Sequence, residues 1–215
     1  MNYKLLGLVA AGMLSTASAF AAPITMDFEG ATSFSTIDGY YNGGTDGAGV
    51  SGSNNYGISF SGGALALSND GLGTGTNGEY FTNAPTPGTI LAPVDADAVM
   101  NSVGGFTGLT SFFYSASTDT TVTVYDGLNG TGTALYTFNL LANATQGCSD
   151  SAFCHWGSAS TELTSLAHSI QFGNAANLAG FDNVSVSAVP VPTAAWLLLS
   201  GFGSLGVFAR RKKAA

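Results

Sequence analysis

Apolar and polar residues alternate with a period of two in several short runs of the chain. The alternation is regular in Ile24–Phe28 and Thr121–Tyr125, and less regular in Phe181–Val186. A period of two puts successive side chains on opposite faces of an extended strand, so these runs predict half-buried β-strands. No segment in the middle of the chain sustains the period of about 3.6 residues that an amphipathic helix requires.

Further short runs predict additional strands. They are Gly57–Phe60, Ala64–Leu67, Ala98–Val103, Leu109–Ser115, Ala134–Leu140 and His168–Phe172. Turns rich in glycine and asparagine, such as Asp126–Gly130, lie between them. Many short strands at this spacing are typical of an all-β domain, and we expect a single β-sandwich of the jelly-roll kind.

The N-terminus has the layout of a secretory signal peptide. Lys4 is followed by the apolar stretch Leu5–Leu14 and then by small residues that offer two A-x-A cleavage sites. The charge, the length of the apolar stretch and the small residues all indicate export, with cleavage after Ala21. The alternative is a buried N-terminal helix. The predicted domain therefore covers residues 22–188, after a signal peptide at residues 1–21.

The C-terminus combines an uncharged stretch with a basic cluster. Thr193–Ala209 carries no charge and would span about 26 Å as a helix, close to the bilayer core of about 30 Å. Four basic residues follow it: Arg210, Arg211, Lys212 and Lys213. The positive-inside rule would keep them in the cytoplasm and the preceding domain outside. The alternative, a core helix with a basic tail, should show a polar face, and this stretch shows none.

A proline motif precedes this stretch and completes a three-part order. Val189, Pro190, Val191 and Pro192 are followed by the apolar stretch and the basic cluster. The order resembles the PEP-CTERM sorting signal of Gram-negative bacteria, here over residues 189–213. Val191 stands where that family usually has Glu, and the motif is similar to the VPLPA-type variant. The resemblance implies processing by an exosortase and transfer to the cell surface or the extracellular matrix.

Charge is divided sharply between the domain and the ends. All thirteen Asp and Glu residues lie within residues 22–188, and none of the five Lys and Arg residues does, so this part has a formal charge of −13. Such a domain repels phosphate backbones, which excludes nucleic acid as a partner. Anionic lipid surfaces are disfavoured for the same reason.

The chain has two cysteines, Cys148 and Cys154. In an exported protein, an even number of closely spaced cysteines predicts a disulfide. The alternative is a metal site that also uses His155, but these three ligands fall short of the usual four.

Two short stretches resemble the first and last strands of jelly rolls of the carbohydrate-binding-module type. They are MDFEG, from Met26, and FDNVSV, from Phe181. In that family a structural calcium often joins these strands, so the resemblance implies calcium ligands at Glu29 and Asp182, with Asp27 beside them. Carboxylate oxygens suit Ca²⁺. The alternative is that Asp182 hydrogen-bonds a neighbouring turn and that Glu29 is solvated.

Binding is a better expectation for this domain than catalysis. The chain contains neither a G-x-S-x-G nor an H-E-x-x-H motif. Aromatic rings in loop-like stretches could stack on sugars, and Trp156 and Tyr41 are the candidates we single out. We therefore expect a glycan-binding or adhesion module that meets extracellular polysaccharide. The alternatives are a structural surface protein without a specific ligand and, less favoured, a secreted glycan hydrolase.

Overall fold

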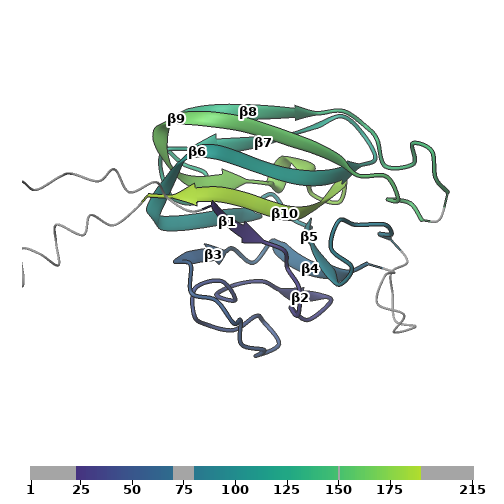
Figure 1. The fold of residues 1–215 in the computed structure, drawn as a ribbon, viewed down its shortest axis with the longest axis horizontal. Helices are drawn as coiled ribbons and strands as arrows, with labels where there is room; N and C mark the ends of the chain where they lie inside the picture. Colours follow the sequence, from purple (N-terminus) through teal and green to yellow (C-terminus); the bar gives the residue numbers. More distant parts are fainter. Residues whose placement is uncertain (1–22, 70–79, 150, 190–215) are drawn as a thin grey trace, which may run out of the picture.

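The computed structural model describes residues 23–69, 80–149 and 151–189. Within them, ten strands form one hydrogen-bonded antiparallel sheet, and the one helical element is a 3₁₀ turn (Figure 1). The elements are β1 (Pro23–Met26), β2 (Ser35–Thr36), β3 (Ile58–Phe60), β4 (Ala64–Ser68), β5 (Thr89–Pro93), β6 (Val99–Ala116), β7 (Thr120–Tyr125), β8 (Ala134–Leu140), β9 (Gly157–Gln171), η2 (Gly173–Ala175) and β10 (Ala179–Ala188).

The sheet brings the two ends of the domain together. Its strand order is β2-β4-β5-β10-β6-β9-β7-β8, with β1 added on β10 and β3 on β6. The first strand pairs antiparallel with the last, from Pro23 opposite Ser187 to Met26 opposite Val184. The chain therefore enters and leaves the domain at the same end, where the β10 arrow finishes in Figure 1.

The two longest strands, β6 and β9, each pair with more than one other strand. β6 pairs with β3, β9 and β10, and β9 pairs with both β6 and β7. Positive φ angles at Gly105 (75°) and Gly108 (72°) accompany register shifts where β6 lies beside β9. Glycine adopts this left-handed conformation without the steric penalty of a side chain, so it permits the irregularity inside a continuous strand.

Two apolar clusters stabilise the domain. The main core contains residues from strands near both ends of the sheet order, such as β4 and β8. Within it, the ring of Phe112 meets those of Phe138 and Phe181 edge to face. Leu91 of β5 lies in this core, whereas its neighbours Ile90 and Ala92 lie in a second, smaller cluster. Because side chains alternate along a strand, the second cluster lies on the opposite face of β5.

The prediction of an all-β domain is confirmed for the described residues. Ala134–Leu140 is a strand as expected, while the two strands predicted at 98–103 and 109–115 are parts of the single strand β6. No helix in the described part of the chain is long and apolar enough to cross a membrane. The signal peptide at residues 1–21 and the predicted spanning stretch at 193–209 lie outside the described residues.

Candidate functional site

An irregular segment, residues 80–88, leads into β5 and organises the part of the domain that concerns function. We call it the pre-β5 segment. Its first half contacts the loop that contains the two cysteines, and its second half contacts the carboxylates of Asp182, in β10, and of Glu29, which follows β1. The predicted acidic residues Asp182 and Glu29 and the predicted aromatic residue Trp156 therefore all contact this segment.

Asp182 anchors the second half of the pre-β5 segment. Its side chain is fully buried and accepts hydrogen bonds from the backbone N–H of Thr86 (2.8 Å), the Thr86 hydroxyl (2.9 Å) and the N–H of Asn183 (2.7 Å). The Thr86 hydroxyl also lies 3.3 Å from the backbone oxygen of Asp27. A buried carboxylate is tolerated when donors surround it in this way.

Burial raises the pKa of Asp182 from 3.8 to about 6. The hydrogen bonds from Thr86 and Asn183 lower the pKa, and the nearby charge of Glu29 raises it further. Desolvation is the largest of these effects, because it disfavours the charged form of a carboxyl group. The Asp182 carboxyl therefore changes its charge in a mildly acidic range.

Glu29 and Asp27 complete the carboxylate group. Oε1 of Glu29 accepts from the backbone N–H of Gly88 (2.7 Å) and of Thr89 (3.3 Å). Oδ1 of Asp27 accepts from the N–H of Glu29 (3.2 Å) and lies 3.4 Å from the Tyr41 hydroxyl. A Cβ atom at Gly88 would overlap the Glu29 carboxylate, so this contact depends on a glycine.

The three predicted calcium ligands thus lie around one segment, as hydrogen-bond acceptors. Both oxygens of Asp182 and Oε1 of Glu29 are directed at N–H or hydroxyl donors, and Ca²⁺ needs six to eight oxygen ligands. Among the described residues, no three His, Cys, Asp or Glu side chains are grouped to hold a metal ion. The arrangement fits a hydrogen-bonded anchor, and calcium binding at these residues stays a prediction.

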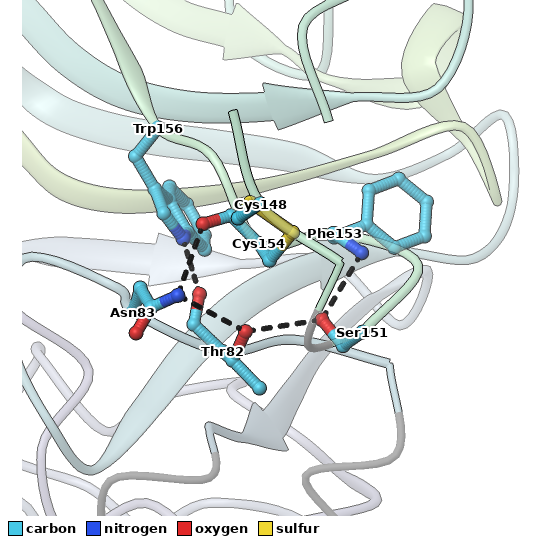
Figure 2. Close-up of a disulfide and its surroundings, with 7 residues drawn as sticks. All are labelled: Thr82, Asn83, Cys148, Ser151, Phe153, Cys154 and Trp156. Carbon is cyan, nitrogen blue, oxygen red and sulfur yellow. Dashed lines mark hydrogen bonds between the residues drawn. A yellow bond between two sulfur atoms is a disulfide. The ribbon is translucent and has the colours of Figure 1, made fainter. Parts of the chain in front are cut away.

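The two cysteines lie at disulfide distance, as the sequence predicts. Their Sγ atoms are 2.10 Å apart, and the bond closes the loop from Cys148 to Cys154 (Figure 2). Cys154 is buried, and its N–H donates to the backbone oxygen of Ala144 (2.7 Å). The disulfide therefore connects a surface turn to a point that is already fixed in the domain.

This disulfide loop pairs with the first half of the pre-β5 segment. The N–H of Phe153 donates to the oxygen of Tyr80 (3.0 Å), and the N–H of Thr82 donates to the oxygen of Phe153 (3.0 Å). The hydroxyls of Thr82 and Ser151 lie 3.2 Å apart. Figure 2 shows Thr82 and Ser151 below the disulfide and Phe153 beside it.

Trp156 also stabilises the contact between the disulfide loop and the pre-β5 segment. Its indole N–H donates to the backbone oxygen of Thr82, at 2.9 Å (Figure 2). Its ring lies 6.1 Å from that of Phe81. The ring is half-buried in the second apolar cluster. Trp156 therefore supports the junction between the disulfide loop and the pre-β5 segment.

An open groove of about 410 Å³ lies next to this junction. Phe34 and Tyr80 are its most accessible rings, with 56% and 50% of their surface exposed. The lining consists of Phe34, Leu65, Leu67, Tyr80, Phe81, Ala92, Pro93, Val94, Phe153, Asn177 and Ala179. We call it the aromatic groove; it is an apolar surface with two half-exposed rings and one amide among its lining side chains.

Tyr41 is not a sugar-stacking residue in this structure, because it is only 2% exposed. Its ring contacts Phe28, Tyr40 and Tyr56 in the main core, and its hydroxyl accepts from the N–H of Phe28 (2.6 Å). Burial strongly raises the pKa of the Tyr41 phenol, and the charge of Asp27 adds to the rise. The glycine-rich stretch around it looks like an exposed loop in the sequence but folds back onto the core.

Sequence reasoning missed Phe34, Phe81 and Phe153 as members of a site. None of them lies in an alternating run, and they come from three distant parts of the chain. Of the predicted sorting residues, Val189 is described: it is 37% exposed, and its N–H lies 3.4 Å from the oxygen of Gly105. Pro190, Val191, Pro192 and the basic residues 210–213 lie outside the described residues.

Comparison with known proteins adds no relative to this description. No protein-family model matches the chain, and a search of the curated proteins finds no match. The residues and their geometry therefore carry the functional argument for this protein.

Proposed function

We propose that this chain is an exported protein that an exosortase processes and delivers to the cell surface or extracellular matrix of a Gram-negative bacterium, where its all-β domain binds a neutral polysaccharide. The observation that carries the binding part is the aromatic groove, in which Phe34 and Tyr80 offer half-exposed rings beside an apolar floor. Aromatic faces bury the apolar C–H faces of sugar rings, and concave apolar sites with few polar groups are typical of ligand binding.

Charge supports a neutral ligand. Residues 22–188 carry thirteen carboxylates and no Lys or Arg. An anionic polysaccharide would be repelled by this field, and it would find no cationic side chain in the domain to pair with. A neutral chain of hexoses can be bound through aromatic ring faces and hydrogen bonds, without a cationic side chain.

The fold we propose is a jelly-roll-like β-sandwich. Two observations support it: the terminal strands β1 and β10 pair with each other, and the strands at both ends of the sheet order share one core. In this arrangement the aromatic groove lies on the outer face of β4 and β5, away from that core. A site on the outer face can take a long chain without disturbing the interior.

Binding is tested with the full-length protein on immobilised cellulose, dextran and galactomannan. We expect saturable retention on at least one of them, weakened about tenfold or more by Tyr80→Ala or Phe34→Ala, which corresponds to about 1.4 kcal/mol. Tyr136→Ala is the matched control, since Tyr136 is 41% exposed and belongs to β8 rather than to the groove. Absence of retention by the wild type would leave a structural surface protein, and release of soluble sugar would indicate a hydrolase.

Sorting is tested separately. Expression in a Gram-negative host that has an exosortase should yield a product that lacks both the N-terminal residues 1–21 and the basic C-terminal cluster. Intact-mass measurement of the surface fraction checks this outcome. A product that keeps Arg210 to Lys213 in that host would contradict the proposed processing.

A further inference from the structure

The aromatic groove has one wall that belongs to the disulfide loop. Phe153 lines the groove, and its ring stacks on that of Phe81, with centroids 4.7 Å apart. The next residue in the chain is Cys154, whose sulfur bonds to that of Cys148. The groove wall and the disulfide are therefore adjacent in sequence and share one short loop.

Backbone hydrogen bonds connect Phe153, which forms this wall, to the pre-β5 segment. Phe153 donates to Tyr80 and accepts from Thr82, which together form a short parallel pairing around Phe81. Tyr80 supplies one of the two exposed rings of the groove. A displacement of Phe153 therefore also displaces the ring that is proposed to meet the ligand.

The two halves of the disulfide loop differ in how firmly the rest of the domain holds them. On one side, the N–H groups of Cys154 and His155 both donate to the oxygen of Ala144, at 2.7 and 2.9 Å. On the other side, the backbone hydrogen bond of Cys148 within the described residues runs from its N–H to the oxygen of Thr145 and is long, at 3.4 Å. The covalent bond is thus the strongest constraint on the Cys148 side and on the nearby Ser151, whose hydroxyl accepts from the N–H of Phe153 (3.2 Å) and lies 3.2 Å from that of Thr82. Opening it gives the residues between the cysteines many more conformations.

We propose that the Cys148–Cys154 disulfide is a positioning element for the aromatic groove: by fixing the loop that holds Phe153, it sets where Phe153 and Tyr80 lie and thereby the affinity for the ligand. This inference rests on the proposed function of the groove. Its structural basis, the dependence of the Phe153–Tyr80 junction on the disulfide, does not need the ligand to be known.

The first experiment is hydrogen exchange at single amides, measured by NMR on the full-length protein before and after reduction. A phosphine reductant and one water convert the Sγ–Sγ bond into two thiols, and the phosphine becomes its oxide. We expect the amides of Phe153 and Thr82, which form the junction, to exchange at least about tenfold faster after reduction. The amides of Thr86 and Gly88, which donate to Asp182 and Glu29, should keep their rates. Equal acceleration of all four amides, or of none, would overturn the proposal.

The second experiment measures affinity for the neutral polysaccharide that the wild type binds. Reduction of the wild type and the variant Cys148→Ala/Cys154→Ala should each weaken binding by about tenfold, and reoxidation should restore it in the wild type alone. The phosphine should have no further effect on the double variant, which controls for the reagent. Unchanged affinity with an opened junction would overturn the role in binding. If the oxidised wild type binds no polysaccharide, the proposed function fails, and the exchange experiment still decides the positioning role.

Discussion

The two halves of the pre-β5 segment are held by different physical means. Residues 86–88 are bound by carboxylates: Asp182 of β10 and Glu29, which follows β1, accept their backbone N–H groups. Residues 80–83 are bound by neutral groups: backbone pairing with Phe153, the Trp156 indole, and a loop closed by a disulfide. Hydrogen bonds to carboxylates hold residues 86–88, whereas residues 80–83 pair with a loop that the disulfide closes.

This difference separates stability from ligand binding. The carboxylate half connects the first and last strands to β5, so its loss should affect the whole domain. The disulfide half forms the wall of the aromatic groove, so its loss should act locally. Four predictions test this division, starting with the largest expected effect.

Asp182→Ala should give the largest loss of stability, about 3–5 kcal/mol of unfolding free energy. The substitution leaves the partly buried N–H groups of Thr86 and Asn183 without their acceptor and empties the fully buried site of the carboxylate. Urea unfolding at neutral pH measures the loss. Glu162→Ala, which removes an exposed carboxylate of β9, is the control and should change the free energy little. A similar loss in both variants would argue against a special role for the buried carboxylate.

The second prediction concerns pH. The Asp182 carboxyl has a pKa of about 6 when folded, against an ordinary value of 3.8. The folded state therefore holds its proton more tightly, and the pH-dependent part of this group's contribution to stability is fully present below pH 4 and is lost as the pH rises through about 6, while the hydrogen bonds that its carboxylate accepts remain. The change is on the order of 3 kcal/mol.

Urea unfolding of the wild type and of Asp182→Asn across this range isolates the effect of Asp182. The variant lacks the titrating group, so the stability advantage of the wild type should shrink as the pH rises from about 4 to about 7. An advantage that is constant with pH would show that the folded and unfolded states bind this proton equally.

Two glycine substitutions test the two halves of the segment with the same chemical change. A Cβ at Gly88 would overlap the Glu29 carboxylate, and a Cβ at Gly180 would overlap the ring of Phe81. Each Ala variant should lose about 1–3 kcal/mol, as overpacked sites do. Gly180→Ala should also weaken polysaccharide binding and shift the fluorescence of Trp156, because it displaces Phe81. Gly62→Ala is the control, since its Cβ would meet no atom within 4 Å. If Gly88→Ala weakens binding as much as Gly180→Ala does, the two halves are not independent.

Calcium should have the smallest effect. Both oxygens of Asp182 and one of Glu29 already accept hydrogen bonds, so calcium would compete with these donors, and we expect at most a small rise in the melting temperature of the wild type in calcium relative to EDTA. A ligand that binds the folded state at 100 times its Kd would stabilise it by about 2.7 kcal/mol, which thermal unfolding detects readily. A calcium-dependent rise that disappears in Glu29→Gln would establish the metal site implied by the jelly-roll resemblance.

The strands that the pattern missed have identifiable reasons. All five residues of β5 are buried, because each of its faces carries an apolar cluster, and such a strand shows no alternation. The first half of β9 is rich in small polar residues, several of them exposed, and it resembles a loop. Glycines at 105 and 108 look like a turn in the sequence but lie inside β6.

The amino-acid sequence alone was sufficient to predict the all-β class, most of the strands and the pairing of Cys148 with Cys154. These properties depend on local alternation and on the chemistry of two neighbouring cysteines, which a linear pattern records. The tertiary structure alone decided that Tyr41 is buried and that Phe34, Tyr80 and Phe153 share a groove. Those properties depend on which segments distant in the chain come together, and strand pairing across the sheet determines this, not the residues near each ring.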